Sequence, residues 1–172
     1  IYGVVATNTS GTLSFGTIVQ IYNGTTTNAA GLSGRMLSST AGIVVVDRAS
    51  NALAVPITIS GTTISVGTAS ATFGVAQSNN AASAVTTNAL MVLSSTLLGI
   101  VYYTSATAVV VNTITHNGAS APTIGTASTA ITVTSGAAAA GVTLTSTTAQ
   151  ILYITNGTNS TSTTTGALTV AG

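Results

Sequence analysis

Three stretches of the chain decide the fold: SGTLSFGT at residues 10–17, SGTTISVGT at residues 60–68 and NGASAPTIGT at residues 117–126. Each joins a glycine-containing turn to a short run of alternating apolar and small polar residues. Such alternation fits a half-buried β-strand, and glycine supplies the positive φ that tight hairpins need. The sequence therefore predicts the same turn and strand three times.

The spacing of these stretches predicts an internal repeat. The turn glycines recur at steps of 50, 57 and 54 residues: Gly11, Gly61, Gly118 and Gly172. A second set of anchors recurs at steps of 56 and 51 residues: Leu37, Leu93 and Leu144. Two independent anchors with the same drifting period favour a true repeat over shared low complexity.

Each repeat reads as four strands. In the middle copy we expect strands at 85–93, 99–104, 108–117 and 122–128, separated by short turns of small, polar or glycine-containing sequence. A unit of about 40–55 residues with four strands is typical of a β-propeller blade. The expected fold is all-β and propeller-like, with about three four-stranded antiparallel repeats of 50–57 residues per chain.

The repeat also predicts how the chain divides. We expect one repeat-built β domain over 1–172, in which 1–17 completes a blade and three repeats follow, the last incomplete: 18–70, 71–128 and 129–172. Residues 1–11 and 163–172 resemble two copies of the same third strand. We therefore expect the missing outer strand to come from another copy, or from protein outside these residues, so that no sheet edge stays bare.

Charge is almost absent. The only charged side chains are Arg35, Asp47 and Arg48, and the net charge is +1. Without a basic cluster, the electrostatic attraction that drives phosphate binding is missing, which argues against nucleic acid and anionic membranes as partners. Thr, Ser, Asn or Gly interrupts every apolar run before it reaches the roughly 20 residues of a membrane-spanning helix.

The same scarcity argues against catalysis. The chain has one histidine, His116, one carboxylate, Asp47, and no cysteine. A metal site needs three or four ligands, a Ser-His-Asp triad needs a base and an acid in one place, and a glycosidase needs two carboxylates. We expect no enzyme, no cofactor and no metal, and we expect His116 to bond the backbone of its turn.

The turn-and-strand pattern, together with GIVVVDRASNALAV and GIVYYTSATAVVV, resembles the propeller repeats of tailed-phage structural proteins. The resemblance covers most of residues 10–170. It implies a fibre, tail or capsid-decoration protein of a virion. Such a protein would bind copies of itself and other assembly proteins. Some members of the family contact host-surface sugars. No catalytic residue belongs to the pattern. This chain departs from it in its scarcity of charge, since Thr104 and Thr155 replace the acidic turn residue that Asp47 keeps.

Five residues are candidate contacts for a partner or a glycan: Arg35, Asp47, Arg48, Tyr102 and Tyr103. Asp47 and Arg48 form a hairpin that either contacts a sugar or is capped by Asp47 with Arg48 in solvent. Arg35 either anchors an interface or lies along a strand edge. The two tyrosines must point to opposite faces of one strand, so one packs between blades and the other either stacks on a sugar or packs as well.

Two other functions stay open. The first is a subunit of an extracellular archaeal or bacterial filament or surface layer, joined by strand exchange. Low charge, abundant Thr and four glycosylation sequons, which begin at Asn8, Asn23, Asn156 and Asn159, suit that function. The second is a lectin used in adhesion. In each case the expected location is a virion or the extracellular space.

Overall fold

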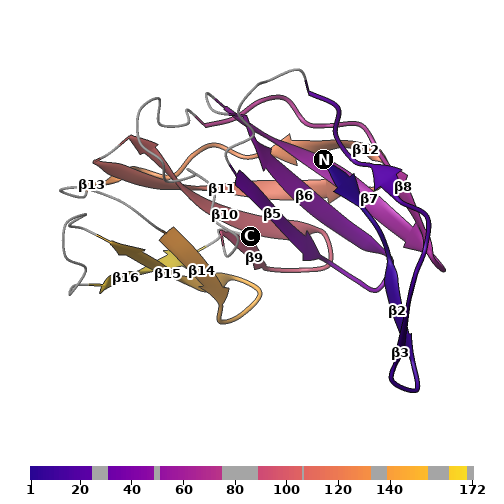
Figure 1. Cartoon of the computed structure of the whole chain (residues 1–172). Coiled ribbons are helices and arrows are strands. Elements are labelled where there is room, and N and C mark those ends of the chain that lie inside the picture. Colours follow the sequence, from indigo (N-terminus) through magenta and orange to yellow (C-terminus); the bar gives the residue numbers. More distant parts are fainter. Residues whose placement is uncertain are drawn as a thin grey trace.

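The computed structural model describes residues 1–24, 31–48, 51–74, 89–105, 107–132, 139–154 and 163–169. Within these ranges the regular structure consists of β-strands in antiparallel sheets, which confirms the predicted all-β class (Figure 1). The described ranges contain no helix of the length and apolarity needed to cross a bilayer.

Two of the sheets are built around a four-stranded meander. The first sheet has the order β5-β6-β7-β8, with strands Gly31–Met36, Ala41–Asp47, Ala52–Ser60 and Thr63–Val66. The second sheet has the order β9-β10-β11-β12, with strands Leu90–Val92, Leu97–Ser105, Ala108–Asn117 and Ser120–Ile124. Its four strands follow the predicted order with limits shifted by a few residues, although 85–88 lie outside the described residues. The short β13 (Ile131–Thr132) also pairs with β11.

The remaining strands lie at the two ends of the chain. The third sheet has the order β14-β15-β16, with strands Ala139–Thr143, Thr148–Ile154 and Thr163–Thr169. The N-terminal layer consists of two pairs, β1 (Tyr2–Gly3) with β4 (Val19–Gln20) and β2 (Ala6–Thr9) with β3 (Thr12–Phe15). In Figure 1 the β2–β3 hairpin extends away from the rest of the molecule.

One turn recurs in all three sheets, between their first two strands. Its hydroxyl oxygen, from Ser38, Ser94 or Thr145, accepts the backbone N–H groups two and three residues further on, at 3.0–3.2 Å. The leucine before each hydroxyl donates its N–H to the carbonyl four residues later, at 2.8–3.0 Å. Ser and Thr favour such turns because their side chains replace a backbone partner. The three leucine anchors of the sequence repeat thus occupy the same position in the same turn.

The N-terminal layer repeats the outer half of the first sheet at a constant spacing of 51 residues. Asn8 pairs with Leu13 as Ile59 pairs with Ile64. In the same way, the pair Ala6–Phe15 matches Ile57–Val66, and Thr9–Thr12 matches Ser60–Thr63. The hydrogen bond from Gly16 N to Val5 O likewise matches the one from Gly67 N to Pro56 O. The step of 50 taken from the turn glycines is therefore one residue short. Ser10, with φ 51°, holds the place of Gly61, with φ 58°.

The sheets stack face to face, with apolar side chains between them. In β6, Val44 and Val46 pack toward the N-terminal layer, whereas Ile43 and Val45 pack toward the second sheet. This division follows from the alternation of side chains along a strand. A Cβ at Gly141 of the third sheet would meet the side chain of Met91, so the third sheet covers the other face of the second. The described residues form an open stack of four layers, not a closed ring of blades.

Candidate interaction surfaces

The lone histidine takes part in a hairpin turn. His116 is buried at the end of β11, and its Nδ1 accepts the N–H of Gly118 at 3.2 Å. Gly118 itself has φ 66°, the left-handed region that favours glycine. Among the described residues, no group of three or more His, Cys, Asp or Glu side chains could hold a metal ion.

Asp47 and Arg48 lie where β6 ends, and neither projects freely into solvent. Asp47 is buried, and the backbone N–H of Arg48 donates to the backbone carbonyl of Asn51 at 2.8 Å. The Arg48 guanidinium lies 5.8 Å from the ring centroid of Tyr22, within the range of a cation–π contact. Arg48 therefore links the loop after β6 to the segment that follows β4.

Tyr102 and Tyr103 point to opposite faces of β10, and both side chains are buried. The Tyr102 hydroxyl donates to Asn112 Oδ1, and Asn112 Nδ2 donates to the carbonyl of Gly125 at 2.6 Å. The Tyr102 ring meets Phe73 of the neighbouring layer edge to face, with centroids 5.9 Å apart. Burial raises the pKa of the Tyr102 phenol. Neither ring can stack on a sugar, so both tyrosines match the expectation that they pack inside the protein.

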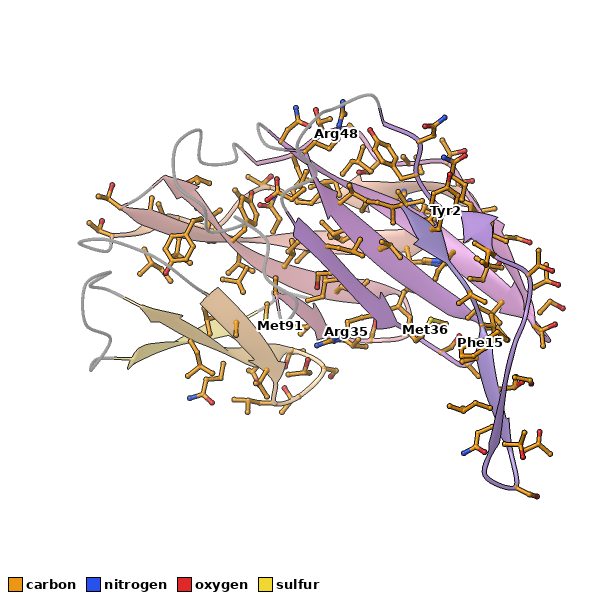
Figure 2. The ribbon with its side chains drawn as sticks, viewed as in Figure 1. Tyr2, Phe15, Arg35, Met36, Arg48 and Met91 are labelled. Carbon is orange, nitrogen blue, oxygen red and sulfur yellow. The ribbon has the colours of Figure 1, made fainter. Side chains whose placement is uncertain are left out.

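Arg35 lies on β5, the edge strand of the first sheet, and its side chain is exposed. Its Nη1 donates to the carbonyl of Gly34 at 3.1 Å. Met36 follows it on the same strand and is also exposed, and both lie near the end of β5 (Figure 2). Of the five candidates, Arg35 is exposed, Arg48 is partly buried, and the other three are buried.

Sequence reasoning missed the most exposed apolar side chains. On the N-terminal layer they are Tyr2, Leu13, Phe15 and Ile18, each 63–69% exposed. On the third sheet and its first turn they are Val142 and Leu144, 49% and 60% exposed. Tyr2 and Phe15 lie across the molecule from the third sheet (Figure 2). The stack thus presents an apolar surface at each end.

Four of these six exposed residues occupy positions that are buried in the neighbouring layer: Tyr2, Leu13, Val142 and Leu144. At a spacing of 51 residues, Leu13 corresponds to Ile64, which is 7% exposed. Leu144 corresponds to Leu93, which is 4% exposed. Comparing each residue with its counterparts in the repeat identifies the positions at which layers meet, once the order of the layers is known.

No protein-family model, curated protein or solved structure matches the chain.

Proposed function

We propose that the protein is a structural subunit of a virion or extracellular assembly, in the class of phage tail, fibre or capsid-decoration proteins. Its layers act as blade-like units of a propeller-type stack, and its partners are copies of itself and other assembly proteins. It performs no catalysis and needs no cofactor. The resemblance of its repeats to tailed-phage propeller repeats supports this class.

One observation carries the proposal: both ends of the stack expose side chains whose counterparts inside the chain are buried. Exposed apolar patches on a protein usually mark interaction sites. A chain with 2% charged residues also has little charge repulsion to keep single copies apart. Association would bury the exposed apolar side chains, and charge repulsion would not oppose it.

Sugar binding through the two tyrosines of β10 is not part of the proposal, since both rings are buried. A filament or surface-layer subunit is the second candidate. It is favoured by the exposed Asn8 and Asn23, which both begin sequons and would accept glycans without disturbing the core. Mass spectrometry of the protein from its native source separates the two, because glycans on these asparagines support the filament.

The test of the proposal is the state of association of the purified chain. Sedimentation velocity over a range of concentrations should show oligomers that grow with concentration, and electron microscopy should show regular particles or threads. A chain that sediments as a monomer up to its solubility limit contradicts the proposed function.

A further inference from the structure

We infer that copies of this chain associate head to tail, with the outer face of the third sheet of one copy packed on the outer face of the N-terminal layer of the next. The inference rests on the proposed function and specifies the contact that assembly uses. The partner is therefore a second copy, and the two surfaces that meet are different.

The layers have a direction, which the inner contacts reveal. Leu93 and Met91 lie on the face of the second sheet that meets the third sheet, and we call this the forward face. Leu53 and Ile64 lie on the face of the first sheet that meets the N-terminal layer, and we call this the backward face. Inside the chain, every forward face packs on the backward face of the following layer.

The third sheet ends the stack with its forward face uncovered. A Cβ at Gly141 would point toward Met91 of the second sheet, so the neighbouring Val142 points outward, and Leu144 points the same way. At the corresponding positions in the second sheet, Met91 and Leu93 are almost completely buried. The forward face of the third sheet thus has the residues of a layer contact and no layer against it among the described residues.

The N-terminal layer begins the stack with its backward face uncovered. A Cβ at Gly3 would point at Ile21 and Ile64, toward the first sheet, so Tyr2 points away from that sheet. Tyr2 is 66% exposed, whereas its counterpart Leu53 is 5% exposed and packs in the core. Leu13, on β3, stands in the same relation to Ile64.

Backbone contacts between layers repeat as well. A Cβ at Gly16 would meet the carbonyl oxygen of Thr62, and one at Gly67 would meet that of Ala119. In both cases the glycine that follows the outer strand of one layer lies on the hairpin turn of the next. Gly11 holds the corresponding turn position in the N-terminal layer, and it is exposed.

Charge and geometry both fit a second copy. Residues 1–22 and 139–154 contain no charged side chain, so bringing the faces together removes no ionised side chain from water. The two faces of one chain cannot meet each other, because two sheets lie between them, and packed sheets are about 10 Å apart. A contact between unlike faces leaves one of each free, which allows growth into a ring or a filament.

The test blocks one face at a time. Leu144→Lys places a charge on the forward face, and Leu13→Lys places one on the backward face. Each exposed leucine can be replaced without opening the core, and circular dichroism with thermal melting confirms folding. Each variant alone should lose association, with a constant about 10- to 100-fold lower than that of the unchanged chain. Mixed in equal amounts, the two variants should form a one-to-one dimer that grows no further, since each keeps the face that the other lacks.

Two matched controls place the charge nearby but off the contact. Ser14→Lys lies on the opposite side of β3 from Leu13, and Ser146→Lys lies in the exposed turn after Leu144. Both should associate as the unchanged chain does. If the unchanged chain assembles but either leucine variant alone still forms dimers, the contact is not head to tail and the inference fails while the proposed function stands. A monomeric unchanged chain overturns both.

Discussion

The burial of the repeated leucine predicts unequal effects of one substitution at equivalent sites. Leu93→Ala removes a side chain that is 4% exposed between two sheets, and such a change costs about 2–5 kcal/mol of unfolding free energy. Leu144→Ala removes one that is 60% exposed, and we expect a cost below about 1 kcal/mol. The two leucines occupy the same position in the same turn, yet their contributions to the free energy of unfolding should differ several-fold.

The assay is urea unfolding of dilute, monomeric protein, followed by circular dichroism. The midpoint should fall clearly for Leu93→Ala at an unchanged slope and move little for Leu144→Ala. At about 2–4 °C per kcal/mol for a chain of this size, the melting temperature should drop by about 4–20 °C for Leu93→Ala. Equal losses at the two sites would refute the reasoning, because they would mean that the third sheet is covered as the second sheet is.

Three further predictions follow from single contacts. Gly61→Val should cost about 1–3 kcal/mol, because a β-branched residue is strained at φ 58°, whereas Ser60→Val should cost less; equal thermal melts would contradict this. Ser70→Ala should cost about 1–3 kcal/mol, because the Ser70 hydroxyl accepts the N–H of the buried Ala54 at 2.9 Å; Ser70→Thr, which keeps the hydroxyl, is the control in the same urea assay. Burial raises the pKa of Tyr102, so the folded state holds the phenol proton to a higher pH than the unfolded state does. The free energy of unfolding should therefore be unaffected by this group below a pH of about 10, the ordinary pKa of tyrosine, and should fall above it. Tyr102→Phe should flatten that alkaline decline, and an unchanged decline would contradict the assignment.

Much of the local structure could be predicted from the sequence. Alternation within each strand and polar residues between strands predicted the four strands of the second sheet in their order. The repeated leucine turn also followed from the register of the sequence, because Ser and Thr hydroxyls at those positions have a local bonding role that needs no tertiary contact. These features depend on residues close together in the sequence, so they can be predicted without knowledge of the fold.

Exposure could not be predicted in the same way. Tyr102 and Tyr103 were expected on opposite faces of one strand, and they are, but their sheet lies between two others, so both faces are buried. Asp47 is buried at the end of an inner strand for the same reason. A repeated sequence does not say which copy lies inside the stack and which lies at its end. The five candidate contacts were chosen by residue type, whereas the exposed surfaces depend on the order of the layers.

The close approach of one layer to the next was also hidden from the sequence. Gly16 and Gly67 each come directly after the outer strand of their layer. The structure adds that the hairpin carbonyl of the following layer lies where their side chains would be. Glycine at these positions therefore reports a contact between layers about 50 residues apart, which no local pattern encodes.

The central claim is that the two exposed ends of the stack are the surfaces through which copies meet. Hydroxyl-radical footprinting tests it directly, since the reactivity of Leu13, Phe15 and Leu144 can be compared in dilute and assembled protein. The account predicts that both ends become protected together on assembly, while Met91, which is 1% exposed inside the stack, stays unreactive in both states. Assembly that leaves Leu13 and Leu144 as reactive as in the monomer would contradict it.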